Sequence, residues 1–374
     1  MSLGLYVHIP FCSAICNYCN FNRGLFDVAL KERYVAALLT EIRRAADGVP
    51  ADTIYFGGGT PSLLEPSEVA AVIDACRQSW ALDRSAEVTL EANPETVTPE
   101  RLAGFRAAGV NRLSYGVQSF RDDELGRLSR LHSARRAIEA FGMARAAGFD
   151  NISLDLMMWL PQQTVSQWIE SVEALIELGP DHASMYMLEI YPNAPLRDAM
   201  ARGRWSVAPE DDAAEMYLSG LDRMDQAGYV QYEISNVARP GRHSRHNLKY
   251  WTDGEWLGLG CSAHSTRAGT RWKYVSAVED YVSSVAAGGQ IVTERRPLSA
   301  EQQLEEALFT WLRLNAGLDL RAVKDRYDVD VWSRYGGELQ PFVDQGVLSY
   351  DGRVLRLPRA GMLLAHEIMA VFIG

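Results

Sequence analysis

Cysteine is scarce in this sequence, and its distribution excludes a disulfide framework. Only five cysteines occur in 374 residues, and an odd number leaves at least one thiol unpaired. Three of them stand close together near the start, whereas Cys76 and Cys261 stand alone and far away. Clustered thiols without a secretion signal are typical of a reducing compartment, so we expect a cytoplasmic protein.

Positive charge and long apolar runs are also limited. The chain has 37 lysines and arginines against 48 aspartates and glutamates, a net charge of −11. This balance argues against nucleic acid as a partner, because phosphate binding requires a basic surface. No apolar run reaches the roughly 20 residues of a membrane-spanning helix. Hydrophobic residues make up 47% of the chain, which is enough for the cores of a large and a small domain.

The clustered thiols follow a short apolar run, Leu5–Ile9, which predicts a β-strand ended by Pro10. Cys12, Cys16 and Cys19 are spaced C-x3-C-x2-C in the loop after it. Thiolates grouped in this way favour an iron–sulfur cluster or a soft metal. Three ligands leave one iron of a cubane cluster open to a small molecule. Zinc remains an alternative, although it usually takes two C-x2-C pairs and only one is present.

Strand-like and helix-like segments alternate from this loop to about residue 227. Six such units predict a parallel sheet covered by helices, short of the eight units of a closed barrel. Polar or glycine-rich segments follow the strands, at the edge where parallel α/β folds place their chemistry. The predicted strands are 5–9, 53–56, 88–91, 112–117, 152–158 and 183–189, and the predicted helices are 30–46, 67–80, 99–108, 133–147, 165–178, 196–202 and 210–227.

The pattern changes after the first domain, 1–227. Residues 228–296 predict irregular strands and loops that cover the open side of the barrel. Residues 297–374 predict a small domain with helices at 300–314, 320–327 and 332–345 and a hairpin turned at Asp351-Gly352. We expect the apolar final helix, 362–373, to pack in the core of this domain; contact with a membrane or a second subunit is the alternative.

The cysteine motif resembles that of the radical S-adenosylmethionine (SAM) superfamily. The segment LYVHIPFC, together with Tyr18 before the third cysteine, resembles the motif of one branch of this superfamily. That branch contains oxygen-independent coproporphyrinogen III dehydrogenases (HemN) and heme chaperones (HemW). The resemblance covers nearly the whole chain. It implies an α/β fold, a partial (β/α)6 barrel of six parallel strands with a small C-terminal winged-helix-like domain. It also implies a [4Fe–4S] cluster on Cys12, Cys16 and Cys19, with SAM on the fourth iron.

The same resemblance implies which residues hold SAM. Aromatic residues stand near the cluster and the adenine, a glycine-rich segment contacts the methionine part, and four polar residues surround the methionine and ribose. These residues are Tyr6, Tyr18, Gly58, Gly59, Thr60, Glu91, Gln118, Arg130 and Asp155.

Several features favour the HemW type over the HemN type. HemN enzymes carry a long extension before the cysteine loop, whereas five residues precede Tyr6, and their additional cysteine is replaced by Phe21. Residues 246–251 match the H-N-x-x-Y-W signature of heme chaperones. The resemblance implies heme bound by His246, with Tyr250 and Trp251 packed on the porphyrin, and delivery to acceptor hemoproteins such as respiratory cytochromes. Coproporphyrinogen III dehydrogenase and a zinc-stabilised scaffold are the alternatives, and a homodimer is compatible with the sequence.

Two segments depart from the family pattern. Where the family reads G-L-P-G-Q, this chain has Trp159-Leu160-Pro161-Gln162-Gln163, and Cys261-Ser262 replaces the more common Pro-Gly. Both departures concern the molecule that occupies the open top of the barrel rather than SAM itself.

Overall fold

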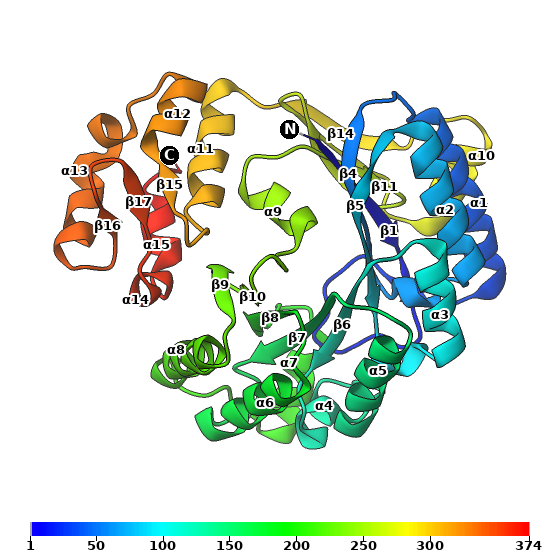
Figure 1. Ribbon diagram of the computed structural model, residues 1–374, viewed down its shortest axis with the longest axis horizontal. Coiled ribbons are helices and arrows are strands. Elements are labelled where there is room, and N and C mark those ends of the chain that lie inside the picture. The colour runs from blue at the N-terminus through cyan, green and yellow to red at the C-terminus, as the bar shows by residue number, and fades with distance from the viewer. Residues whose placement is uncertain (1, 374) are drawn as a thin grey trace.

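The computed structural model describes residues 2–373, and one curved sheet forms its centre (Figure 1). Six parallel strands lie side by side in chain order, as the sequence predicts. They are β1 (Leu3–Ile9), β4 (Pro50–Gly58), β5 (Ala81–Ala92), β6 (Arg112–Gln118), β7 (Ile152–Met158) and β8 (His182–Met187).

Helices cover the outer, convex face of this sheet (Figure 1). Capping side chains begin several of them: Asp27 accepts from Leu30 N at the start of the first helix, and Thr164 forms a capping box with Gln167. The helices of this domain are α1 (Val28–Arg44), α2 (Pro66–Ser79), α3 (Pro99–Ala108), α4 (Asp122–Arg127), α5 (Ala134–Ala146), α6 (Val165–Leu178), α7 (Pro195–Gly203) and α8 (Glu210–Gln226). Of these, α7 lies at the mouth of the barrel, where Leu196 packs in one apolar cluster with Met157 and Tyr18.

The strands of the sheet direct apolar side chains outward and polar side chains inward. Leu5, Val7 and Ile9 of β1 are fully buried in the core between sheet and helices. The alternate residues Tyr6 and His8 face the inside of the curve, because successive side chains of a strand point to opposite faces. The inside of the barrel is consequently polar, and this interior together with the ends of the strands carries the candidate site.

Residues 228–296, which the sequence predicts to cover the open side of the barrel, extend the sheet at both edges. Pairing with free strand edges satisfies backbone groups that a separate cover would leave without partners. β11 (Trp256–Leu259) adds parallel to β1, followed antiparallel by β12 (His264–Arg267), β13 (Thr270–Tyr274) and β14 (Val292–Pro297); β10 (Asn236–Ala238) and β9 (Val230–Glu233) continue from β8. α10 (Val278–Ala286) packs beside α1, and α9 (Arg245–Trp251) lies within the curve (Figure 1).

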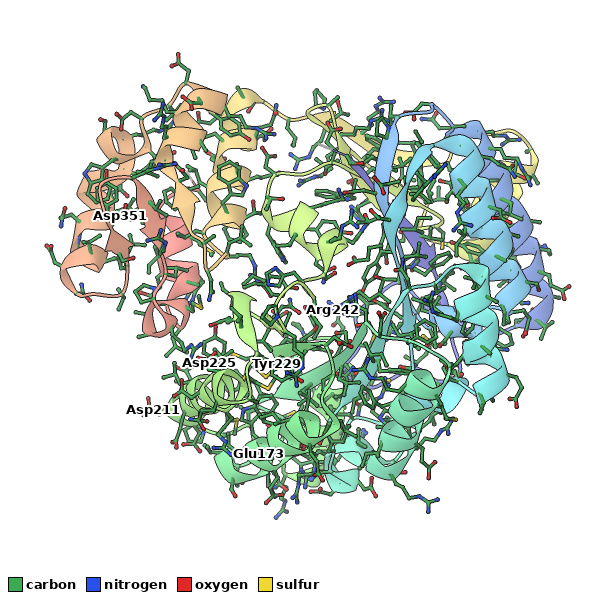
Figure 2. The ribbon with its side chains drawn as sticks, viewed as in Figure 1. Glu173, Asp211, Asp225, Tyr229, Arg242 and Asp351 are labelled. Atoms are coloured by element: carbon green, nitrogen blue, oxygen red, sulfur yellow. The ribbon has the colours of Figure 1, made fainter. Side chains whose placement is uncertain are left out.

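The C-terminal segment is winged-helix-like, as predicted. Three helices accompany a three-stranded sheet of order β15-β17-β16, and Asp351 marks the tip of its hairpin (Figure 2). The elements are α11 (Ala300–Trp311), β15 (Leu318–Asp319), α12 (Leu320–Tyr327), α13 (Val331–Asp344), β16 (Ser349–Tyr350) and β17 (Val354–Arg356).

The single final helix predicted at 362–373 is wrong. Two short helices, α14 (Arg359–Met362) and α15 (Ala365–Ala370), are separated at Leu364, whose backbone is not helical. The bend directs Ile368, Met369 and Phe372 into the core, so the expected core-packing role is confirmed for these side chains. Within residues 2–373, no helix combines the length and apolarity needed to cross a membrane.

Candidate functional site

The three clustered cysteines lie on a loop at the C-terminal end of β1, as the sequence predicts. The loop is closed by β2 (Phe11–Cys12) and β3 (Gly24–Leu25), which pair in parallel. Gly24 N donates to Pro10 O at 2.7 Å and Phe26 N to Cys12 O at 2.9 Å. These bonds fix the two ends of the loop, so all three thiols are held at one edge of the sheet.

The middle of the cysteine loop is tied to neighbouring elements. Asn17 forms two of these hydrogen bonds: its side-chain amide donates to Arg127 O at 2.8 Å, and its backbone carbonyl accepts from Leu196 N at 2.9 Å. Arg130 Nη1 donates to Cys16 Sγ at 3.4 Å. The loop is therefore positioned by α4, by α7 and by the arginine that the resemblance assigns to SAM.

The thiols supply donors suited to an iron–sulfur cluster, although the structure does not bring them into a ligand arrangement. Within residues 2–373, no group of three histidine, cysteine, aspartate or glutamate side chains is arranged to hold a metal ion. Burial raises the pKa of the Cys12 and Cys19 thiols, which must lose their protons to ligate iron. The donor set of three thiols on one loop, without carboxylate or imidazole, matches cluster chemistry rather than magnesium or calcium chemistry.

The glycine-rich segment after β4 lies directly against the cysteine loop. Gly59 N donates to Ile9 O at 2.8 Å, and Thr60 N donates to Phe11 O at 2.7 Å. A Cβ atom on Gly59 would stand 2.6 Å from Phe11 O and 3.0 Å from Cys12 Sγ. Gly58 has φ +118° and a Cβ there would meet the His8 ring. Glycine is therefore required here for close backbone approach, beyond the flexibility of a turn.

Three of the four predicted polar residues stand on neighbouring strands, Glu91 on β5, Gln118 on β6 and Asp155 on β7, and Arg130 stands on the loop after α4. Glu91 accepts from Tyr55 OH at 2.7 Å and from Gly58 N at 3.2 Å. Asp155 accepts from Ser114 Oγ at 3.4 Å, Gln118 Oε1 accepts from Tyr186 OH at 2.7 Å, and Arg130 Nη2 donates to Asn93 Oδ1 at 2.7 Å and to Gly116 O at 2.6 Å.

Burial shapes the charge of this polar set. It raises the pKa of Glu91 to about 7, against the opposing hydrogen bond from Tyr55, and the nearby charge of Asp155 raises it further. It raises the pKa of Asp155 to about 6, although a hydrogen bond with Ser184 acts in the opposite direction. A cationic group placed beside these carboxylates would favour their charged forms.

Two buried polar atoms at the site have no partner within the protein. Arg130 Nε and Asn17 Oδ1 are fully buried, and no described residue offers either of them a hydrogen bond. Buried polar atoms normally find a partner, so both are available to a small polar molecule between the cysteine loop and the strands. This supports the predicted place of SAM.

The two predicted aromatic residues occupy different surroundings. Tyr6 faces the barrel interior, where its ring stacks on Tyr55 with centroids 6.2 Å apart and its OH lies 3.0 Å from His8 Nδ1. Tyr18 packs at the edge of a small apolar cluster that includes Met157 and Leu188. Tyr18 thus stands at the mouth of the barrel and Tyr6 deeper within it.

Several residues that the sequence motifs do not single out orient the polar set. Tyr55, Asn93, Ser114 and Tyr186 each bond to one of its members. The alternation of side chains along a strand could have identified two of them. Tyr55 points to the same face of its strand as Gly57, and Ser114 points to the same face as Gly116.

The H-N-x-x-Y-W motif lies deeper in the barrel, where the His246 ring stacks on Tyr55 with centroids 5.1 Å apart, next to the polar set. It forms α9, where His246 Nδ1 lies 2.8 Å from Thr53 Oγ1 and Nε2 lies 2.9 Å from Tyr250 OH. Thr53 stands near the start of β4, at the opposite end of the barrel from the cysteine loop. Arg313 stacks 4.3 Å over the ring of Trp251, which links the motif to the C-terminal segment.

This position weighs against His246 as a heme ligand. The side chain is 1% exposed, and both ring nitrogens have hydrogen-bond partners. Burial, helped by the charges of Lys249 and Arg112, lowers the pKa of His246 to about 3, so the ring is neutral but its lone pair is engaged. An iron would have to displace these bonds. The neighbouring His243 is half-buried and stacks on Tyr232 with centroids 4.4 Å apart.

The departures from the family pattern share one conformation. Trp159, Gln162 and Ser262 all have φ +61°, in the left-handed region that favours glycine. They stand where the family pattern has glycine. Trp159 is held there by a bond from its Nε1 to Ala208 O at 2.8 Å. At these three positions the chain therefore adopts a backbone conformation that glycine adopts more readily.

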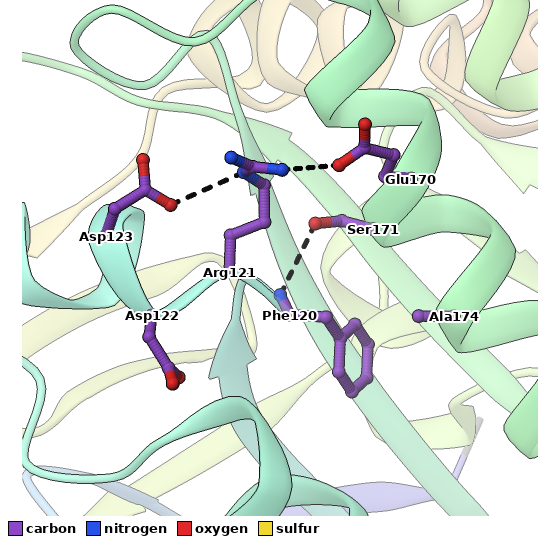
Figure 3. Close-up of a pocket in the computed structure, with 7 residues that line it drawn as sticks. All are labelled: Phe120, Arg121, Asp122, Asp123, Glu170, Ser171 and Ala174. Atoms are coloured by element: carbon purple, nitrogen blue, oxygen red, sulfur yellow. Dashed lines mark hydrogen bonds and ion pairs between the residues drawn. The ribbon is translucent and has the colours of Figure 1, made fainter.

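A separate hollow of about 370 Å³ lies on the helical side, between α4 and α6 (Figure 3). Arg121 projects into it and pairs with Glu170 and, at 3.4 Å, with Asp123. Phe120 N donates to Ser171 Oγ at 3.3 Å. The charges are paired with one another, so this hollow offers no group comparable to those beside the cysteine loop.

Comparison with known proteins agrees with this geometry. The family model of the radical SAM superfamily matches residues 6–203, and that of the HemN C-terminal domain matches residues 298–364. The heme chaperone HemW of Bacillus subtilis is 35% identical over 373 residues, covering 99% of this chain and 98% of that protein. The mitochondrial radical S-adenosyl methionine domain-containing protein 1 of Bos taurus is 38% identical, covering 98% of this chain and 86% of that protein.

A solved structure shares the whole fold. Coproporphyrinogen III oxidase (HemN) from Escherichia coli aligns over 99% of this chain and 90% of its own with a TM-score of 0.87, at 24% identity. The likeness at this identity establishes the fold alone. The family match, the full-length sequence similarity and the shared fold agree. The chain belongs to the radical SAM superfamily and, within it, to the HemW family.

Proposed function

We propose that this protein is a heme chaperone that holds a [4Fe–4S] cluster and SAM, binds heme and delivers it to hemoproteins, respiratory cytochromes among them. The observation that carries the proposal is the full-length similarity to proteins named heme chaperone HemW. The fold is shared with a coproporphyrinogen III oxidase, so the fold does not distinguish a chaperone from an enzyme.

Cys12, Cys16 and Cys19 would hold the cluster. When bound, such a cluster supplies single electrons and an iron with an open coordination position. Two contacts fix the position of the cysteine loop. The pairing of Phe11 with Gly24 closes the loop, and hydrogen bonds of Asn17 connect it to α4 and α7. Arg130 places a positive charge beside Cys16, with its Nη1 3.4 Å from the sulfur.

The residues next to the loop would hold SAM. The backbone of Gly58 and Gly59 can approach a ligand closely because neither residue has a side chain. Glu91 and Asp155 accept hydrogen bonds from an ammonium or from hydroxyl groups, and the unpartnered Nε of Arg130 can donate to a carboxylate. Asn93 and Gly116 fix the Arg130 guanidinium from the other side, which orients it before the ligand arrives.

An anaerobic assay separates the chaperone from the dehydrogenase. The reconstituted protein is given coproporphyrinogen III, SAM and a reductant, and in a second sample hemin is titrated while the Soret band is recorded. We expect hemin binding near one equivalent per chain and little or no decarboxylation. Steady formation of the divinyl product, with SAM consumed in step, would replace the chaperone with the dehydrogenase. Stoichiometric zinc without iron in the anaerobically isolated protein would contradict both.

A further inference from the structure

The first residue of β6 is an arginine buried inside the barrel. Arg112 is 1% exposed. The residue after it, Leu113, packs in the core on the helical side, so Arg112 points to the inner face. The next inward residue of the strand, Ser114, bonds to Asp155. Arg112 therefore lies one layer deeper in the barrel than the polar set beside the cysteine loop.

No acidic side chain neutralises Arg112. Within residues 2–373, no carboxylate oxygen lies within 4.0 Å of its nitrogens, and its guanidinium donates no hydrogen bond. Its Nε is completely buried and has no partner. A buried charge is costly unless it is paired, and buried arginines are normally found with a carboxylate or phosphate.

The acids nearest to Arg112 in the barrel are bound to other groups. Burial raises the pKa of Glu91 and of Asp155, and the charge of Arg112 acts in the opposite direction, so it is close to both without touching either. Glu87 accepts from the backbone of Arg245 and His246 at 3.1 Å each, Glu91 accepts from Tyr55 and Gly58, and Asp155 accepts from Ser114.

A second unpartnered donor stands beside Arg112. Thr89 is its cross-strand partner in the β5–β6 register, is fully buried, and has an Oγ1 without a hydrogen-bond partner. The nearby histidines do not serve as hydrogen-bond partners for Arg112 or Thr89, because both ring nitrogens of His182 and of His246 are bonded to other groups. A guanidinium fork with a hydroxyl at its side matches the two oxygens of a carboxylate.

We infer that Arg112 and Thr89 bind a carboxylate group of a ligand that enters the barrel. The identity of that ligand rests on the proposed function, in which both small molecules carry carboxylates. Heme has two propionates, whereas the single carboxylate of SAM is already assigned to Arg130, so a heme propionate is the group that remains for Arg112. The carboxylate site lies beneath Glu91 and Asp155, so a ligand that reaches it passes the polar set and is oriented along the barrel.

Paired ligands with and without the carboxylate test the site. Wild type, Arg112→Gln and Thr89→Val are titrated with hemin and hemin dimethyl ester, and with SAM and decarboxylated SAM. Arg106→Gln, the same change on the outer helix α3, is the matched control. We expect wild type and Arg106→Gln to prefer hemin at least tenfold over hemin dimethyl ester. Arg112→Gln should abolish this preference and Thr89→Val should reduce it, while the preference for SAM over decarboxylated SAM, which depends on Arg130, should be retained. Loss of the SAM preference in Arg112→Gln, with the hemin preference retained, would contradict heme as the source of the carboxylate.

A measurement without either ligand keeps the inference independent. Sodium propionate should raise the thermal unfolding midpoint of wild type relative to sodium chloride at equal ionic strength, and the rise should be absent in Arg112→Gln. If wild type binds neither hemin nor SAM, the proposed function fails and the propionate comparison still decides the site. If Arg112→Gln does not fold, Arg112→Lys and Thr89→Val carry the same comparisons. Unchanged preferences in all variants, with no effect of propionate on wild type, would make Arg112 purely structural and overturn the inference.

Discussion

At the scale of single residues, Arg130 is the side chain that joins the cysteine loop to the sheet. It contacts Cys16 on the loop and Asn93 and Gly116 at the strand ends. The family resemblance predicts Arg130 as a SAM contact. The sequence could not predict its fixed orientation or its unpartnered Nε, because these depend on residues from three other parts of the chain.

Arg130→Gln should weaken SAM binding about tenfold or more, because a ligand carboxylate would lose a charged donor worth roughly 1–3 kcal/mol. Equilibrium dialysis with the reconstituted protein measures this effect. Arg127→Gln, which removes a neighbouring arginine paired with Asp123, is the control and should bind SAM like wild type. Equal affinity in both variants would exclude Arg130 from the SAM site.

His246→Ala tests the reading of the H-N-x-x-Y-W motif. Because the imidazole is buried and bonded to Thr53 and Tyr250, we expect the variant to lose stability by roughly 1–3 kcal/mol. The Soret band of the heme complex should be unchanged. Chemical denaturation and a hemin titration measure the two effects. A shifted Soret band in a folded variant would return His246 to the role of ligand and would require α9 to move.

Backbone conformation gives a further prediction at the residue scale. Gln162 and Ser262 have φ +61°, where a residue with a side chain is disfavoured by about 1–2 kcal/mol relative to glycine. The greater freedom of glycine in the unfolded chain offsets about half of this. Ser262→Gly should therefore raise the free energy of unfolding by up to about 1 kcal/mol in a denaturant titration. Ser265→Gly, in an extended strand, is the control and should lower it.

At the scale of elements, a buried acid on α1 connects three segments. Glu41 accepts from Gly260 N at 2.9 Å, on the loop after β11, and from Tyr281 OH on α10. Burial raises the pKa of Glu41 from its ordinary 4.5 to about 7, although these hydrogen bonds oppose the shift. The neutral form is therefore the one that suits the folded protein.

The resulting pH dependence has a definite sign. The folded pKa of Glu41 lies above the unfolded one, so its contribution is fully present below about pH 4.5 and is lost as the pH rises through about 7. By pH 8 wild type should lose on the order of 2–3 kcal/mol relative to pH 5 from this group. Glu41→Gln should remove this part of the slope, whereas Glu32→Gln on the exposed side of α1 should retain it. Parallel slopes in all three proteins would refute the assignment.

The elements also show which predictions the sequence could support. Strands and helices of the first domain follow clear apolar periods, and β7, α3 and α6 begin and end where the sequence predicts. The strand pairing of residues 228–296 was harder to predict, because these strands are short and their pairing partners, β1 and β8, lie far away in the sequence. The break at Leu364 depends on contacts with the rest of the small domain, which periodicity does not contain.

At the scale of the whole molecule, the two ends of the barrel have different characters. One end carries the cysteine loop, the glycine-rich segment and the polar set. The other is filled by α9, whose His246, Tyr250 and Trp251 contact the sheet and the C-terminal segment. The sequence motifs single out both groups, but only the structure shows that they adjoin inside the barrel, where the His246 ring stacks on Tyr55 and Tyr55 bonds to Glu91.

The central claim, that this protein carries heme for other proteins, is tested most directly by heme transfer. The protein is loaded with hemin, freed of excess ligand, and mixed with an apo-hemoprotein while the spectrum of the acceptor is followed. We predict that the acceptor gains heme in proportion to the heme lost by this protein, and faster than from hemin-loaded serum albumin. No transfer beyond the albumin control, from a protein that has bound hemin and its cluster, would contradict the account.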